Sequence, residues 1–100
     1  MEKIITLREG ILIALVDDGE SIIQIEVSLK EFKIPFTRDL VKEQIINLIN
    51  EELVEIVFPP DKTIDDLIKS NNESIEAFWF ELSKRGRKEW EKIDDYKYLD

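Results

Sequence analysis

The first half of the chain carries apolar residues at helical spacing in three successive stretches. Two of them begin with the form of a capping box, TLRE at residues 6–9 and SIIQ at residues 21–24, in which paired side chains satisfy backbone N–H groups. Thr37 offers a third N-cap, followed by an acid in the first turn. The pattern predicts helices over about residues 7–17, over about three turns from Ser21 until Pro35, and over about residues 38–51. Gly19 is expected to take the left-handed conformation after the first helix.

The second half of the chain changes to a strand pattern. Residues 53–58 are rich in β-branched side chains and stop at Pro59, and residues 75–83 are the expected partner strand. Side chains of that partner alternate between two faces, with Phe78, Phe80 and Leu82 on one and Ala77, Trp79 and Glu81 on the other. The polar connection over residues 59–74 is long for a hairpin. Its apolar residues fit a short helical turn and are Ile64, Leu67 and Ile68.

A last helix is expected over residues 84 to about 94, with Ser83 as its N-cap. Gly86, Trp90 and Ile93 fall on one stripe of this helix. Because glycine costs helix stability, close packing of Gly86 against another element is the expected compensation. The tail over residues 95–100 is expected to fray, although its apolar residues could dock.

Together these elements predict a single domain over residues 1–100 of the α+β class, with three helices, a two-stranded β-hairpin with a long loop, and a C-terminal helix. This order resembles the winged helix-turn-helix superfamily of bacterial regulators. Residues 50–56 (NEELVEI) look like the passage from a recognition helix to the first wing strand. Residues 80–90 (FELSKRGRKEW) are similar to the passage that closes many such wings. The chain departs from the family pattern in its long wing loop and its acidic third helix.

The resemblance implies that the third helix enters the major groove of DNA, where polar and basic side chains read the bases. The candidates for DNA contact are Arg38, Lys42, Gln44, Asn47 and Asn50 on this helix, and the basic cluster Lys84, Arg85, Arg87 and Lys88 on the last one. Charge weighs against this role, because the chain holds 23 acidic and 14 basic residues. Residues 38–52 alone hold two basic side chains against four acidic ones. The alternatives are a solvated helix face and a basic cluster that offsets acidic neighbours.

The chemistry available to the chain is narrow. It contains no Cys and no His, which removes thiolate zinc sites, cysteine nucleophiles and the commonest general base. The paired carboxylates at residues 17–18, 65–66 and 94–95 lack calcium-loop spacing, and no nucleophile motif, P-loop or dinucleotide fingerprint occurs. We therefore expect no catalytic residue, cofactor, metal or small-molecule ligand. The longest apolar run, residues 11–16, is far shorter than the ~20 residues of a membrane span, so the sequence predicts a cytoplasmic protein without a membrane partner.

Two functional hypotheses follow. One is a non-enzymatic protein that acts through protein contacts, as a regulator, an adaptor or an inhibitory partner of the immunity type. The other is a sequence-specific DNA-binding transcriptional regulator. The net charge of -9 favours the first, and the family resemblance favours the second.

The resemblance also points to a homodimer through the terminal helices. The expected interface residues there are Trp90, Ile93, Tyr96 and Tyr98, together with Ile4 and Ile5. Trp79 is a further interface candidate, because a strand that is apolar on both faces needs a cover on each. In the rival interpretation, Trp90 and Ile93 complete the core of a monomer.

Overall fold

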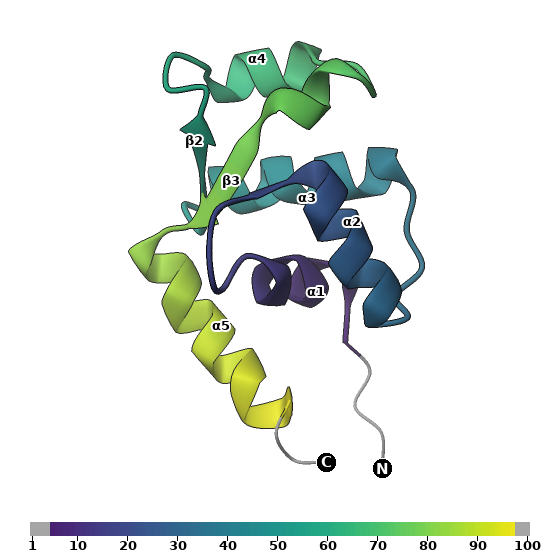
Figure 1. Cartoon of the computed structure of the whole chain (residues 1–100). Coiled ribbons are helices and arrows are strands. Elements are labelled where there is room, and N and C mark those ends of the chain that lie inside the picture. The colour runs from purple at the N-terminus through teal and green to yellow at the C-terminus, as the bar shows by residue number, and fades with distance from the viewer. Residues whose placement is uncertain (1–4, 98–100) are drawn as a thin grey trace.

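A computed structural model describes the backbone of residues 5–97 and the side chains of residues 5–93. Within that part of the chain, five α-helices and one 3-10 helix accompany a three-stranded antiparallel sheet, and the fold is a compact α+β globule (Figure 1). The helices are α1 (Leu7–Ala14), α2 (Ile22–Glu31), α3 (Arg38–Asn50), α4 (Ile64–Lys69), the 3-10 helix η1 (Ser74–Ala77) and α5 (Lys84–Lys97). The strands are β1 (Glu20–Ser21), β2 (Val54–Phe58) and β3 (Trp79–Leu82).

The predicted caps start the first three helices. At α1, Thr6 N donates to Glu9 Oε1 at 2.9 Å and Glu9 N donates back to Thr6 Oγ1 at 3.1 Å. At α2, Ser21 N donates to Gln24 Oε1 at 3.1 Å, and at α3 Leu40 N donates to Thr37 Oγ1 at 3.2 Å. These bonds involve residues only three apart, which is why the sequence alone reveals them.

The ends of these helices differ from the prediction. α1 stops at Ala14, before residue 17, because its last turn tightens: Leu15 N donates to both Ile11 O and Leu12 O at 3.2 Å. Gly19 does not adopt the left-handed conformation, so that expectation is wrong. The left-handed residues of the described chain are Lys33 (φ 61°) and Glu52 (φ 65°), which follow α2 and α3.

Both left-handed residues belong to a Schellman motif. After α3, Leu53 N donates to Leu48 O and Glu52 N donates to Ile49 O, each at 2.9 Å. After α2, the corresponding bonds run from Ile34 N to Leu29 O and from Lys33 N to Lys30 O, each at 3.0 Å. The chain therefore turns sharply after α2 and after α3 without a glycine at either turn.

The sheet has three strands where the sequence predicted two. β3 lies between β1 and β2 and is antiparallel to both. β1 has only two residues, too few for an alternating pattern to be recognised, and pairs Glu20 with Phe80 and Ser21 with Trp79. The predicted strand over residues 75–83 begins only at Trp79, because residues 74–77 form η1.

The core lies between the helices and the inner face of the sheet. Phe80 is fully buried, and its ring stacks on that of Phe78 with centroids 6.4 Å apart. The other fully buried large side chains come from α1 to α4, the loop after α1 and η1, and are Ile11, Leu12, Leu15, Ile22, Ile25, Leu29, Ile45, Leu48, Leu67, Ile75 and Val41. The predicted alternation in β3 is confirmed, since Phe78, Phe80 and Leu82 are buried whereas Trp79 is exposed.

α5 is fixed to the rest of the fold at its first turn. Ser83 caps it as predicted, with Gly86 N donating to Ser83 Oγ at 3.0 Å, and Ser83 N donates to Leu53 O at 2.9 Å. The close packing expected of Gly86 is confirmed, because a Cβ added there would lie 2.0 Å from Leu53 O. From this point α5 runs beside α1 (Figure 1), and Ile93 is buried.

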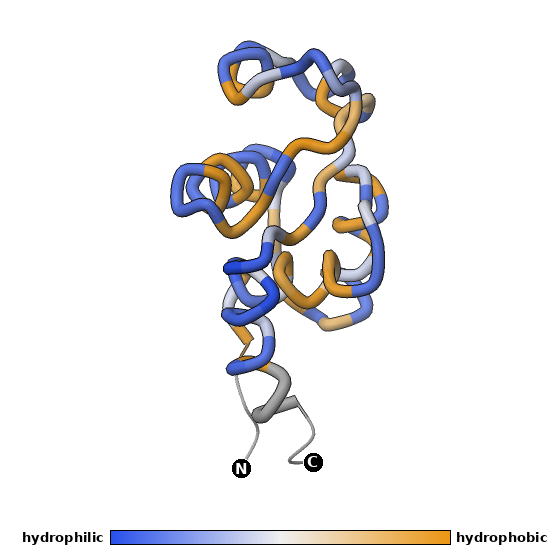
Figure 2. Tube along the Cα trace, turned by 90° about the vertical axis from the view of Figure 1, so that its left-hand side faces the viewer, coloured by the Kyte–Doolittle hydropathy of each residue, from blue (hydrophilic) through white to orange (hydrophobic). Residues whose placement is uncertain are grey.

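Hydrophobic and hydrophilic residues alternate along the helices of the trace (Figure 2). Among residues 5–97, no helix combines the length and the hydropathy that crossing a membrane requires.

The predicted short helix in the long loop is confirmed as α4, which begins at a capping box between Thr63 and Asp66.

Candidate functional site

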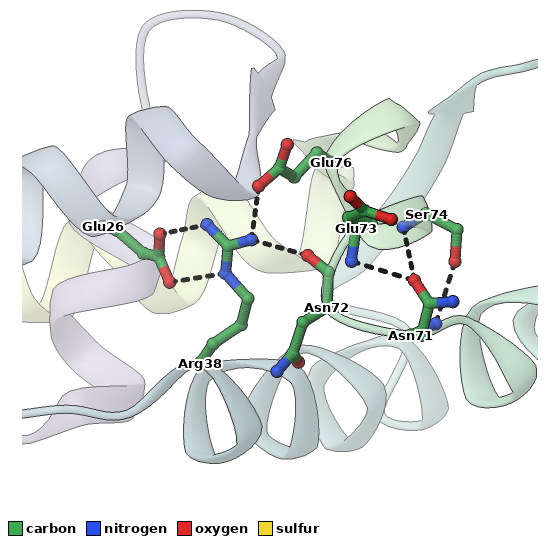
Figure 3. Close-up of polar contacts among 7 residues, drawn as sticks. All are labelled: Glu26, Arg38, Asn71, Asn72, Glu73, Ser74 and Glu76. Atoms are coloured by element: carbon green, nitrogen blue, oxygen red, sulfur yellow. Dashed lines mark hydrogen bonds and ion pairs between the residues drawn. The ribbon is translucent and has the colours of Figure 1, made fainter.

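Arg38, the first residue of α3, is held by carboxylates from two other elements (Figure 3). Its Nε donates to Glu26 Oε2 at 3.0 Å and its Nη2 to Glu26 Oε1 at 2.6 Å, which is a bidentate pair with α2. Its Nη1 donates to Glu76 Oε2 at 2.5 Å and to Asn72 O at 2.7 Å, both in the segment between β2 and β3. The bonds to Glu26 and then Glu76 raise the pKa of Arg38, so the guanidinium is a charged link among three elements.

A local turn presents Asn72 O and Glu76 to Arg38. Asn71 Oδ1 accepts hydrogen bonds from Glu73 N at 2.9 Å and from Ser74 N at 2.8 Å (Figure 3). Such bonds between an Asn side chain and the following backbone compete with an extended conformation. They explain why the predicted strand does not begin at Ile75 and why this segment turns back toward α3.

Lys42, one helical turn after Arg38, is also engaged within the chain. Its Nζ donates to Ile68 O at 3.1 Å and to Ser70 O at 2.6 Å, at the C-terminal end of α4. A cation at that position satisfies carbonyls that lack helical partners and complements the helix dipole. The two basic side chains of α3 therefore hold the β2–β3 connection in place.

The rest of α3 offers neutral and acidic groups to solvent. Gln44 is half-buried, and Asn47 and Asn50 are exposed. Asp39 and Glu43 are exposed as well. The surface of α3 thus lacks the positive charge that would attract a phosphate backbone.

The basic cluster at the start of α5 lies beside the acidic end of α3. Arg85 Nη1 pairs with Glu52 Oε2 at 3.1 Å, and Arg87 Nη1 donates to Val16 O at 3.0 Å. Lys84 and Lys88 are exposed and form no ion pair within the described residues. Arg85 and Arg87 therefore form contacts within the chain at its surface, whereas the two lysines have no ion-pair partner among the described residues.

A second pair in this region joins α1 to the end of α3. Arg8 Nη2 donates to Glu51 Oε1 at 2.8 Å, and this bond holds the pKa of Glu51 below its usual range. Arg8 is one of the basic side chains that offset the acids after α3. Within the α5 cluster, Arg85 pairs with an acid in the way that the offsetting interpretation expects; Arg8, which was not part of that prediction, does the same.

The predicted interface residues fall into three groups. Ile93 is buried in the core of the single chain and Trp90 is half-buried against it, as in the monomer interpretation. Trp79 is 37% exposed on the outer face of the sheet. Ile5 is partly buried against the core. Ile4, Tyr96 and Tyr98 lie outside the described side chains.

Two further apolar side chains on the sheet were not predicted as surface residues. Phe58 is 55% exposed and Val57 is 39% exposed, both at the end of β2. The apolar run before Pro59 predicts a strand, but it does not indicate that these two side chains stay exposed. Together with Trp79, these residues make the outer face of the sheet the second candidate surface.

Within the described residues, no group of three or more acidic side chains is arranged to hold a metal ion. The chain matches no protein-family model, no curated protein and no solved structure.

Proposed function

We propose that this chain is a non-enzymatic, winged-helix-like protein that acts through protein contacts, as a regulator, an adaptor or an inhibitory partner, and does not read DNA. The order of elements supports the winged-helix part: a helix, a short strand, two helices in contact and two antiparallel strands, followed by a helix. The segment 59–78 takes the place of a simple wing loop.

The main support for the functional proposal is that Arg38 and Lys42 already form hydrogen bonds and ion pairs within the chain. For Arg38 to reach a phosphate, its guanidinium would have to leave Glu26, which is itself only 15% exposed, and also Glu76. Abandoning a partly buried carboxylate is costly because it is left without its partner. Lys42 would have to leave the end of α4. DNA binding by α3 in the family mode would therefore disrupt contacts that hold the β2–β3 connection.

Net charge supports the same proposal. Non-specific affinity for DNA comes from cations that displace counterions from the phosphates. The chain has a net charge of -9, and the remaining groups on α3 are neutral or acidic. A positively charged protein is the better electrostatic complement to this surface.

One observation favours the alternative, a sequence-specific DNA-binding regulator. Lys84 and Lys88 are exposed at the start of α5, and Asn47 is exposed on α3. In this alternative the two lysines contact phosphates, whereas Asn47 and Gln44 read bases. The homodimer stays a prediction. It loses one expected contact, because Ile93 is already buried within the single chain.

Repeated selection from a library of random DNA duplexes, at a salt concentration of about 150 mM, separates the two functions. We expect no sequence to be enriched. Enrichment of one sequence, with affinity that falls for Asn47→Ala or for Lys84→Ala with Lys88→Ala, would support the DNA-binding regulator. Glu31→Ala, at an exposed position on α2, is the control that should leave any such affinity unchanged.

A further inference from the structure

The outer face of the sheet carries a row of apolar side chains. Trp79 pairs with Ser21 on one side and with Phe58 on the other, and directly paired residues project from the same face. Val57 is the extra residue at the irregularity between Ile56 and Phe58. Its Cγ2 would lie 3.6 Å from a Cβ added at Gly19, so Val57 extends over β3 toward the segment before β1.

The next row of the same face is acidic. Glu55 pairs directly with Glu81, an arrangement of like charges that destabilises a sheet. Glu81 Oε2 would lie 4.0 Å from that Gly19 Cβ position, which brings this carboxylate toward the loop that carries Asp17 and Asp18. We call the surface formed by Glu55, Val57, Phe58, Trp79 and Glu81 the acidic sheet face.

More acids lie in the segment that leads into β1, although Glu20 pairs with the buried Phe80 and so projects from the opposite face. Burial and then the charges of Asp18 and Asp17 raise the pKa of Glu20. None of these three acids, nor Glu55 or Glu81, forms an ion pair with a described side chain. Glu55 and Glu81 thus lie on the exposed face itself, and Asp17 and Asp18 belong to the loop near its β1 edge.

Basic side chains lie near both ends of this face. Lys84 and Arg85 line an open hollow with Glu55, where β2 meets the start of α5. Arg85 is paired with Glu52 in that hollow. On the β1 side, Arg87 Nη1 donates to Val16 O at 3.0 Å, next to Asp17. Glu81 and the two aspartates form no ion pair with a described side chain.

We propose that the acidic sheet face binds a basic segment of another protein, whose Lys or Arg side chains pair with Glu55 and Glu81 while Trp79 and Phe58 stack on its apolar or guanidinium groups. This proposal deepens the proposed function and rests on it. Exposed aromatic side chains beside carboxylates suit a cationic partner, because an aromatic ring attracts a cation through its quadrupole. Buried aromatic side chains are also the usual anchors of protein interfaces.

Charge selects this occupant over two others. A second copy of the chain meeting this face across a two-fold axis would bring the same carboxylates into opposition. A nucleic acid would bring phosphates against them. A basic segment instead relieves the repulsion between Glu55 and Glu81 and covers the apolar row.

The probe is a displayed library of random linear peptides, selected on the immobilised full chain at about 150 mM salt. We expect the enriched peptides to carry net positive charge together with aromatic or aliphatic residues. Affinity of one enriched peptide, measured by fluorescence anisotropy, should fall about tenfold or more for Glu55→Lys with Glu81→Lys. It should fall by a similar factor for Phe58→Ser with Trp79→Ser.

Two control variants make the same kinds of substitution on other surfaces of the protein. Asp39→Lys with Glu43→Lys makes the same charge change on α3, and Ile23→Ser with Val27→Ser removes exposed apolar side chains from α2. Each control should change the affinity by less than about twofold. Circular dichroism verifies that every variant is folded.

Three results would overturn the inference: no enriched peptide, enriched peptides without net positive charge, or equal losses in the sheet and α3 charge reversals. The last result would mean general electrostatic attraction with no defined site. The proposed function would fail on a different result, namely the enrichment of a DNA duplex whose binding is weakened by substitutions in α3 or α5. A peptide that binds away from the acidic sheet face would leave the proposed function standing while refuting this inference.

Discussion

The substitution Gly86→Ala tests the junction between α5 and the rest of the fold. Helix propensity alone predicts stabilisation by about 1 kcal/mol, because alanine is the better helix former. The structure predicts the opposite sign. A Cβ at residue 86 would lie 2.0 Å from Leu53 O, 3.0 Å from Leu53 C and 3.2 Å from Leu82 Cδ2, whereas ordinary contacts of a Cβ are 3.4–4 Å.

The size of the effect follows from what must move. The two nearest atoms are backbone atoms, and the Leu53 carbonyl also accepts the hydrogen bond from Ser83 N. Overpacking costs about 1–3 kcal/mol, and weakening that hydrogen bond adds up to about 1 kcal/mol. After the helix-propensity gain is subtracted, a net loss of about 2 kcal/mol remains, which lowers the Tm by roughly 10 °C.

Urea unfolding followed by circular dichroism measures this loss. Lys88→Ala, at an exposed position of the same helix, is the control and should change the free energy of unfolding by less than about 0.5 kcal/mol. Gly10→Ala should cost less than Gly86→Ala, because its nearest obstacles are the flexible side-chain ends Ile34 Cδ1 at 2.6 Å and Leu29 Cδ2 at 2.8 Å. A Gly86→Ala protein as stable as the wild type would refute the packing described for α5.

Substitutions at three further positions test the contacts around α3 and β1. Arg38→Ala should lower the free energy of unfolding by about 2 kcal/mol, because it leaves Glu26 partly buried without its partner, and Arg38→Lys should recover only part of the loss because it cannot form the bidentate pair. Lys42→Met should cost about 1 kcal/mol and speed amide hydrogen exchange in α4 more than in α1. Glu20→Gln should stabilise the protein at pH 7 by less than about 1 kcal/mol. Because the pKa of Glu20 is raised in the folded state, its charge costs stability above that pKa, so the advantage of Glu20→Gln should disappear as the pH falls below the ordinary carboxyl range.

Each of these three expectations has a clear contrary result. Equal stability of Arg38→Lys and the wild type would mean that the bidentate geometry contributes nothing. Uniform acceleration of hydrogen exchange in Lys42→Met would mean that Lys42 does not hold α4 in particular. A Glu20→Gln advantage that persists at low pH would show that its cause is not the carboxylate charge.

Local features of this fold can be predicted from the sequence. The caps at Thr6, Ser21, Thr37 and Ser83 use residues three apart, so the signal and the contact lie in the same short segment. The close packing of Gly86 could also be inferred, because a glycine within a helix needs a compensating contact.

Features that depend on distant residues could not be predicted in the same way. The left-handed residues Lys33 and Glu52 carry no glycine signal, and β1 exists only because β3 lies beside it. Arg38 and Lys42 were identified as candidates from the residue types on α3. Their partners lie between 12 and 38 residues away in the sequence, so only the fold reveals that these side chains are engaged.

The most direct test of the proposed function is a titration of isotope-labelled protein, followed by the amide resonances in NMR spectra. The titrants are the duplex pool from the last round of DNA selection and, separately, an enriched basic peptide. We expect no saturable shifts in residues 38–50 with the duplex, and saturable shifts in residues 55–58 and 79–81 with the peptide. Saturable shifts of residues 38–50 and 84–88 on addition of the duplex would mean that the chain binds DNA through α3 and α5, and the proposed function would be wrong.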